Sequence, residues 1–431
     1  MKAIKTAAAL AAAITILLTG CGQGNDSSER ERETASESSS SVSSHEESSS
    51  TTESTQAESS SAAQSSQAES SSTAESTQAD SSEKATTTGQ TSSASSAAPS
   101  TTAAATTTTA AAAAPHDESG TANKSANYAA VPTSGSWVNG VFVCDRNKGD
   151  RIRGLIGFYG SESCGQKFAA MVNDVKKAVG DKVNVYTLGA PVSSAFYTPK
   201  GVTGVTTDQH KAILDLSKTL DKSVKNIDTY AALASHTNEY IYYRTDHHWT
   251  TLAAYYAVKE FAKAANVPYA PLSSYEKCVK TGFTGSMYTY SNYPEFKTYP
   301  DTYTYYKPKN KYTTTYYNGA FQNGTASQLF LDSAVGSNSY CTILGSDLNL
   351  AEIKTDVKNG RTLVLIKDSY GNALTPYFVG SFEKIYVLDM RYTTVNLRSF
   401  FKKVGATDIL FGSSLSSFYT PSRVDGIRAI L

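Results

Sequence analysis

The spacing of apolar residues after about residue 160 predicts alternating helices and strands. In residues 165–180, Phe168, Met171 and Val175 recur at the spacing of one helical face. A short apolar run at 183–190 comes next, and its length and composition are typical of a strand. This part of the chain therefore reads as a helix followed by a strand.

The C-terminal part continues the alternation. The predicted strands are 361–369, 384–391 and 407–413, and the predicted helices are 208–220, 372–380 and 393–405. Apolar strands separated by helices are the rhythm of a parallel sheet that is covered on both faces. We therefore expect an α/β fold with a mostly parallel sheet.

Ligands of such sheets bind beyond the carboxyl ends of the strands, which directs attention to Asp368 and Ser369. Residues 363–366 read as a buried strand, and Gly371 and Asn372 permit a sharp turn into a helix. A nucleophilic serine suits this position, because the amides of a helix N-terminus can stabilise an oxyanion. A helix-capping role is the competing interpretation of Ser369.

The sequence Asp-His-His-Trp that begins at Asp246 lies between a predicted strand at 239–243 and a predicted helix capped by Thr250. In an extended connection, side chains two residues apart point the same way. Asp246 and His248 are therefore expected to project together, and His247 to point elsewhere. Such a pair suits a serine nucleophile, because imidazole takes the hydroxyl proton and a carboxylate fixes its tautomer.

The same stretch allows a second chemistry. Asp246, His247 and His248 carry side chains that ligate metals, although neighbouring histidines are expected to diverge. The interpretation as a base for a serine is preferred, so no metal is expected. Trp249 is then expected to pack beside the Asp-His pair.

The N-terminus reads as an export signal. Residues 1–20 join a lysine-bearing head to an apolar run that is too short for a comfortable membrane span. The ending LLTG before Cys21 resembles a bacterial lipoprotein signal, whose cysteine is lipidated and becomes the mature N-terminus. A plain secretory signal is the alternative. We expect a lipid-anchored protein at the extracellular face of the cell membrane.

Composition separates a tether from a globular domain. Residues 21–127 are rich in Ser, Thr, Ala and Glu and contain no aromatic residue, so they cannot bury enough apolar surface to fold. All 28 tyrosines, 15 phenylalanines and 2 tryptophans come later, in the predicted domain 128–431. Beyond residue 127, 33 basic residues face 24 acidic ones. This excess suits anionic wall polymers or simply a mildly basic surface.

Several classes of protein find no support in the sequence. It contains no phosphate-binding loop and no nucleic-acid motif, so neither a cofactor nor a nucleic-acid partner is expected. No cysteine spacing suggests structural zinc. Cys144, Cys164, Cys278 and Cys341 form an even set in an exported chain, which predicts one or two disulfides of undetermined pairing.

Two motifs carry a family resemblance. The sequence DHHW at 246–249, followed by IKDSYGNALTPYF at 366–378, resembles the bacterial DHHW-motif proteins. These are similar to SGNH-type esterases and O-acetyltransferases, especially to alginate O-acetyltransferases with a D-x-H-W motif. The resemblance spans about 135–431 and implies a three-layer α/β/α fold with a permuted motif order, in which the D-x-H pair precedes the serine.

The resemblance also implies roles for individual residues. It makes Ser369 the nucleophile, His248 the base and Asp246 the carboxylate that orients the base. A glycine and an asparagine of two further blocks normally complete the SGNH oxyanion hole. In this chain GFTGSMY offers Gly285 and Ser286, and no third-block asparagine is evident.

Two further features have more than one interpretation. Arg391 follows a predicted strand and is expected to meet an anionic substrate, to hold Asp389 or to form a surface ion pair. Tyr303, Tyr305 and Tyr306 lie in a tyrosine-rich stretch between the two motifs. They suit stacking on sugar rings if they are exposed, or the packing of an edge strand if they are not.

Three functions are therefore considered. The first is an extracytoplasmic SGNH-like acyltransferase or esterase that acts on O-acyl groups, chiefly acetyl, of a surface or secreted polysaccharide through an acyl-serine. The second is a non-catalytic glycan-binding module on the same fold, and the third is the metal site. The expected partners are the polysaccharide, the membrane through Cys21 and a membrane protein that delivers the acyl donor.

Overall fold

The computed structural model describes residues 130–348 and 350–431. The predicted signal at 1–20, Cys21 and the predicted linker at 21–127 lie outside the described residues. Within the described part, no helix is long and apolar enough to cross a membrane.

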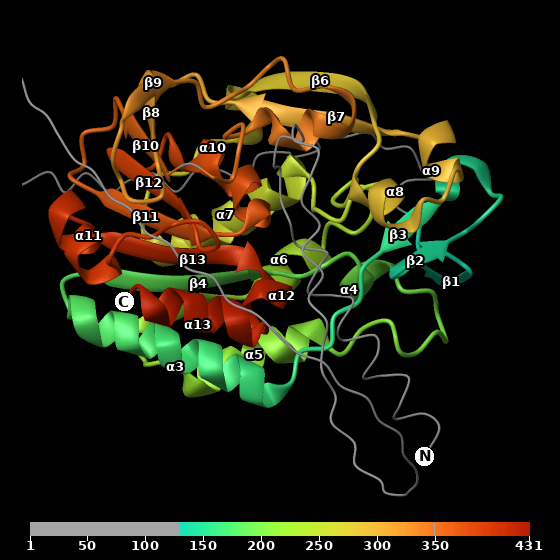
Figure 1. Ribbon diagram of the computed structural model, residues 1–431, viewed down its shortest axis with the longest axis horizontal. Coiled ribbons are helices and arrows are strands. Elements are labelled where there is room, and N and C mark those ends of the chain that lie inside the picture. The colour runs from blue at the N-terminus through green and yellow to red at the C-terminus, as the bar shows by residue number, and fades with distance from the viewer. Residues whose placement is uncertain (1–129, 349) are drawn as a thin grey trace, which may run out of the picture. The chain divides into compact units, whose positions relative to one another are not determined.

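The main sheet confirms the predicted α/β class (Figure 1). In spatial order its eight strands are β5 (Val224–Ile227), β4 (Asn184–Ala190), β13 (Asp408–Ser414), β11 (Thr362–Lys367), β12 (Lys384–Asp389), β10 (Leu350–Thr355), β8 (Tyr312–Tyr317) and β9 (Thr325–Ser327). The strands from β5 to β12 run parallel, and β10, β8 and β9 extend the sheet in antiparallel fashion. The predicted strands around Ser369 are therefore real and central.

Helices cover both faces of the parallel part of the sheet. Phe411 of β13 meets Phe168 of α3 (Glu162–Val179) at a ring-centroid distance of 6.0 Å, whereas Tyr186 of β4 meets Phe261 of α7 (Thr251–Ala265) at 5.0 Å. In the register of β4 and β13, Tyr186 and Phe411 are out of phase by one residue, so they point to opposite faces. Helices α3 and α7 thus belong to opposite layers, and the sheet between them is buried on both sides.

The remaining elements complete the domain. The other α-helices are α4 (Ser194–Tyr197), α5 (Gln209–Thr219), α6 (Thr229–Ala234), α8 (Ser286–Ser291), α9 (Glu295–Thr298), α10 (Thr375–Phe378), α11 (Leu397–Val404), α12 (Leu415–Phe418) and α13 (Pro421–Ala429). Short 3₁₀ helices are η1 (Gly149–Arg151), η2 (Leu272–Ser274), η3 (Gly336–Thr342) and η4 (Ser369–Leu374). Two small antiparallel sheets consist of β1 (Gly135–Val138), β2 (Val141–Cys144) and β3 (Arg153–Leu155), and of β6 (Glu276–Phe283) and β7 (Asp301–Lys307).

The tyrosine-rich stretch is packing and not an exposed platform. Tyr303, Tyr305 and Tyr306 lie on β7 and are buried, and Tyr303 packs against Tyr243 and Phe283. The expectation of sugar stacking on these three rings is therefore wrong. Tyr305 packs against Phe330 and donates a hydrogen bond to Asp332, so these buried rings serve packing within the domain.

The expected disulfides among the four cysteines do not form. Cys144, Cys164 and Cys278 are free thiols, and every pairing among the four requires at least one of them. They lie on different elements, namely β2, the first turn of α3 and β6. Cys144 is buried in the core, where burial raises the pKa of its thiol to about 12. This thiol is a packing group.

Candidate active site

Ser369 lies two residues beyond the end of β11 and opens η4. The residue before it, Asp368, caps this short helix by accepting a hydrogen bond from the Tyr370 amide at 2.9 Å. The same carboxylate accepts hydrogen bonds from the Ser414 amide and from the hydroxyls of Ser414 and Ser417. Through these hydrogen bonds, Asp368 attaches the turn that contains Ser369 to the end of the neighbouring strand β13.

The turn after Ser369 requires a glycine. A Cβ atom on Gly371 would lie 2.4 Å from Cβ of Lys367 and 2.6 Å from the Gly412 carbonyl oxygen. Only a residue without a side chain lets η4 pass so close to the ends of β11 and β13. Gly371 is thus needed because the backbone of η4 lies so close to the ends of these two strands.

The segment before α7 differs from its predicted form. Residues 239–243 form no strand, and only an isolated bridge links Tyr242 to Trp249. A buried carboxylate, Asp301, instead holds this segment by accepting hydrogen bonds from the amides of Arg244 and Thr245. Residues 240–243 are buried but irregular. The segment was predicted as a strand because tyrosines are common in strands, although they also pack well in a buried irregular segment. Thr250 caps α7 as predicted.

Ser369, His248 and Asp246 form a continuous hydrogen-bonded chain. The hydroxyl of Ser369 lies 2.7 Å from Nε2 of His248, and Nδ1 of His248 lies 2.6 Å from Oδ1 of Asp246. All three side chains are buried. The pairing of Asp246 with His248 does not come from an extended backbone, because the segment bends there and Asp246 Oδ1 also accepts the His248 amide at 3.0 Å.

The Asp246 carboxylate is kept ionised. Burial alone would raise its pKa, but His248 and the Ser286 amide outweigh that effect and hold the pKa well below its ordinary value. A permanent negative charge at this position stabilises a positively charged His248. It also fixes the tautomer of His248, with a proton on Nδ1 and a lone pair on Nε2 facing Ser369.

Gly285 and Ser286 support this carboxylate and do not form an oxyanion hole. The Ser286 amide and hydroxyl each donate to Oδ2 of Asp246 at 2.9 Å, and the Gly285 amide donates to the Thr245 hydroxyl. A Cβ atom on Gly285 would lie 2.4 Å from Asp246. Because these amides are already bonded, the expected oxyanion role is wrong for both residues.

The second and third amides of η4 are engaged as well. The Tyr370 amide donates to the Asp368 side chain, and the Gly371 amide donates to the Asp368 carbonyl at 2.9 Å. The amides of Tyr370 and Gly371 are therefore not aimed at a substrate oxygen, so they do not serve as the expected helix N-terminal oxyanion donors.

His247 lies beside His248 and does not point elsewhere. The two ring centroids are 3.8 Å apart, and Nδ1 of His247 lies 2.6 Å from the Ser286 hydroxyl. Ligand-capable atoms of Asp246, His247 and His248 lie within 4.8 Å of one another, so the argument from diverging histidines fails. The hydrogen bonds nevertheless use both oxygens of Asp246 and both nitrogens of His248. A metal ion would have to replace those bonds.

Three aromatic residues hold the site in place, and two of them were not identified from the sequence. Tyr340 stacks on the His248 ring at 3.6 Å and donates a hydrogen bond to the Ser369 carbonyl. The Tyr370 hydroxyl donates to the His247 carbonyl. Trp249, which was expected to pack beside the Asp-His pair, donates from Nε1 to the Tyr370 carbonyl at 3.0 Å. Tyr340 lies in η3, far in the sequence from His248, and belongs to no motif that would have identified it.

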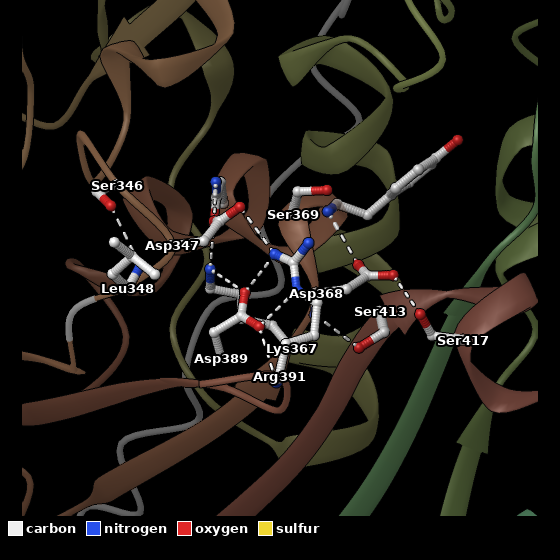
Figure 2. A network of polar contacts seen from close by, with 12 residues as sticks. Ser346, Asp347, Leu348, Lys367, Asp368, Ser369, Asp389, Arg391, Ser413 and Ser417 are labelled. Atoms are coloured by element: carbon white, nitrogen blue, oxygen red, sulfur yellow. Dashed lines mark hydrogen bonds and ion pairs between the residues drawn. The ribbon is translucent and has the colours of Figure 1, made fainter. Parts of the chain in front are cut away.

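A buried charge network lies beneath Ser369 (Figure 2). Lys367 bonds to Asp347 at 2.8 Å and to Asp389 at 2.9 Å, and Arg391 bonds to the same two carboxylates at 2.8 and 2.7 Å. Arg391 thus holds Asp389, which was one of its three predicted roles, and its side chain is only 3% exposed. With two cations and two anions, the network is balanced, and it joins the ends of β11 and β12.

Comparisons with known proteins support one family. A family model described as DHHW protein matches residues 126–388. A solved structure of a DHHW family protein from Eubacterium siraeum is 38% identical, covers 70% of this chain and 98% of its own, and has a TM-score of 0.65. No curated protein sequence matches this chain.

Two more distant structures also match this chain. PatB1 from Bacillus cereus, solved with a sulfonyl adduct, is 16% identical and has a TM-score of 0.54, covering 65% of this chain and 96% of its own. The O-acetyltransferase domain of AlgJ from Pseudomonas putida is 12% identical with a TM-score of 0.40, covering 67% of this chain and 99% of its own.

Proposed function

We propose that this chain, which belongs to the DHHW protein family and has an SGNH-like fold, is an acyltransferase or esterase. Its proposed substrates are O-acyl groups of a polysaccharide. The observation that carries this proposal is the 2.7 Å contact between the Ser369 hydroxyl and His248 Nε2, with Asp246 on the other ring nitrogen. A serine, a base and an orienting carboxylate in this order are the elements of acyl-serine chemistry.

The proposed reaction has two steps. His248 Nε2 takes the proton of the Ser369 hydroxyl while Oγ attacks the carbonyl carbon of the donor ester. The ester C–O bond then breaks, and the departing alcohol takes the proton from His248, which leaves acyl-Ser369. In the second step a sugar hydroxyl or water gives its proton to His248 and attacks the acyl carbon. Ser369 leaves and recovers the proton, so transfer and hydrolysis share the first step.

The proposed acyl group and substrate class are supported by features of the sequence. Acetyl is the proposed acyl group and a surface or secreted polysaccharide the proposed acceptor or substrate, because the sequence has the features of an exported chain and the excess of basic residues beyond residue 127 suits anionic wall polymers. A membrane protein that supplies the acyl donor is part of the same proposal.

The proposed location is the extracellular face of the cell membrane, through a lipid on Cys21. The sequence LLTGC after an apolar run supports it. Full-length protein from cells is expected in the detergent phase of a Triton X-114 partition, and Cys21→Ser protein in the aqueous phase. Partition of both proteins into the aqueous phase would contradict lipidation.

The chemistry is tested by labelling the serine. Sulfonyl fluorides react with activated serines, and PatB1 has been solved with a sulfonyl adduct. We expect full-length protein to gain one adduct from phenylmethanesulfonyl fluoride and one acetyl group from 4-nitrophenyl acetate, as measured by intact-mass spectrometry. Ser369→Ala protein should gain neither, because the attacking oxygen is missing.

A matched control distinguishes Ser369 from its neighbours. Ser416 is also buried, lies just beyond the end of β13, and is not part of the hydrogen-bonded chain. Ser416→Ala protein should therefore be labelled like the wild type. If the folded wild type forms no adduct with several activated esters, the proposed enzyme function fails, and a non-catalytic glycan-binding module becomes the better hypothesis.

A further inference from the structure

The hydrogen bonds around Asp246 determine where the protons lie on His247. The Asp246 carboxylate only accepts hydrogen bonds, so the Ser286 hydroxyl must donate its one proton to Oδ2, at 2.9 Å. The Ser286 oxygen is then an acceptor for its other two partners, the His247 amide at 3.1 Å and His247 Nδ1 at 2.6 Å. Nδ1 of His247 therefore carries the proton.

A neutral imidazole with a proton on Nδ1 has a lone pair on Nε2. Burial, together with the neighbouring His248, lowers the pKa of His247 to about 3, so the ring stays neutral near pH 7. His247 Nε2 is buried and has no hydrogen-bond partner among the described residues. An unpaired acceptor in such a place is costly and calls for a functional explanation.

The geometry shows which way this acceptor points. The Nδ1 atoms of His247 and His248 both face the Asp246 carboxylate, one through Ser286 and one directly. The two rings lie 3.8 Å apart with an angle of 36° between their planes. In each ring Nε2 therefore points away from the group that Nδ1 contacts. The His247 ring thus lies against the ring whose Nε2 contacts Ser369 Oγ, next to the base of the proposed reaction.

We propose that His247 Nε2 accepts a hydrogen bond from a second hydroxyl of the acceptor, next to the hydroxyl that attacks the acyl-serine, so that the site selects vicinal diols. This inference rests on the proposed acyl transfer. In the second step the attacking hydroxyl gives its proton to His248 Nε2 and forms the new ester bond, while the bond from the acyl carbon to Ser369 Oγ breaks. The neighbouring hydroxyl keeps its proton and donates a hydrogen bond to His247. Sugar rings offer such pairs, whereas simple alcohols and water do not.

The test compares two small acceptors that differ by one hydroxyl. Full-length protein is acetylated with 4-nitrophenyl acetate in the presence of cyclohexane-1,2-diol or cyclohexanol, and the acetylated products are quantified by mass spectrometry. The wild type should prefer the diol by about tenfold, the usual effect of one hydrogen bond in a desolvated site. In His247→Asn the amide takes the place of Nδ1 and retains the bond to Ser286, but it offers nothing at Nε2. This variant should lose the preference while Ser369 is still acetylated.

The outcomes separate the possible failures. No acetyl-enzyme in the wild type would end the proposed function, and this inference with it. Acetylation without a diol preference in the wild type would overturn the role of His247 alone. A fall in transfer to both acceptors by the same factor in His247→Asn would assign His247 a purely structural role and overturn the proposal as well. If His247→Asn does not fold, His247→Gln, whose amide oxygen reaches towards the Nε2 position, should retain part of the preference, and its complete loss would count against the proposal.

Discussion

At the scale of single residues, one carboxylate orients two histidines. Asp246 bonds directly to His248 and through the Ser286 hydroxyl to His247, so each ring has a fixed tautomer. The two rings are not equivalent, because only His248 contacts Ser369. One acidic side chain thus prepares both a base for the serine and a neutral acceptor beside it.

The neutrality of His247 predicts a measurable pH dependence of stability. Its pKa is about 3 in the folded protein and 6.5 in the unfolded chain, so between these values the unfolded state binds the extra proton. The free energy of unfolding therefore falls as the pH is lowered through this window, with a contribution of up to about 1.4 kcal/mol per pH unit from this one group. Urea denaturation at several values from pH 7 to pH 4 should show a shallower decline for His247→Asn than for the wild type. Parallel curves for the two proteins would show that His247 is not held neutral by the fold.

At the scale of elements, the site depends on how closely η4 approaches the strands. Gly371→Ala would bring a Cβ atom within 2.6 Å of the Gly412 carbonyl oxygen, and backbone cannot move aside easily. We expect the free energy of unfolding to fall by about 1–3 kcal/mol, as for other overpacked sites. Labelling of Ser369 by a sulfonyl fluoride should slow as well, because the turn that carries the serine shifts.

A second glycine provides the control. Gly426 lies inside α13, and a Cβ atom there meets nothing within 4 Å. Gly426→Ala should leave labelling unchanged and stabilise the protein by up to about 1 kcal/mol, because alanine favours helix. Urea denaturation and the labelling rate check both variants. Equal effects of the two substitutions would refute the close-approach argument.

The elements also show what the sequence can and cannot predict. Strands β11, β12 and β13 were predicted because each is a continuous apolar run between helical patterns, and that signal is local. The meeting of Asp246, His248 and Ser369 was predicted because the first two share a motif and the third follows a strand. The roles of Gly285 and Ser286 were missed because the Gly285 amide reaches Thr245 and the Ser286 amide reaches Asp246 only through tertiary structure, in each case 40 residues away. The tyrosines of β7 were misjudged because composition does not reveal burial.

At the scale of the whole molecule, the charge network connects the stability of the sheet with the position of the serine. Lys367 ends β11, Asp389 ends β12, and Asp347 comes from the loop before β10. Asp347 also accepts a hydrogen bond at 2.9 Å from the side-chain amide of Asn372, three residues after Ser369. A change in the network is therefore expected to affect both folding and labelling of the serine.

Removing one carboxylate should expose this dependence. In Asp347→Asn two buried cations face one carboxylate, and we expect a loss of about 3–5 kcal/mol in the free energy of unfolding at pH 7. The double variant with Lys367→Met restores charge balance and should recover part of that loss, so the two substitutions should not be additive. Urea denaturation of the single and double variants measures the coupling, and strictly additive effects would contradict it.

The effect of Asp347→Asn on stability is also expected to depend on pH. Burial alone would raise the pKa of Asp347, but Lys367 and Arg391 outweigh it and hold the pKa well below the ordinary value of 3.8. A carboxyl group of this kind contributes its full stability above the unfolded pKa and loses it as the pH falls through the folded pKa. The stability difference between wild type and Asp347→Asn should thus be constant from about pH 5 to pH 7 and shrink below about pH 4. His247 changes the free energy of unfolding in a higher pH range, which begins at about pH 6.5, where this residue starts to take up a proton in the unfolded chain. Denaturation curves of the Asp347→Asn, His247→Asn and combined variants therefore separate the two contributions. A difference for Asp347→Asn that persists unchanged at pH 3 would show that the fold does not lower the pKa of this carboxyl group.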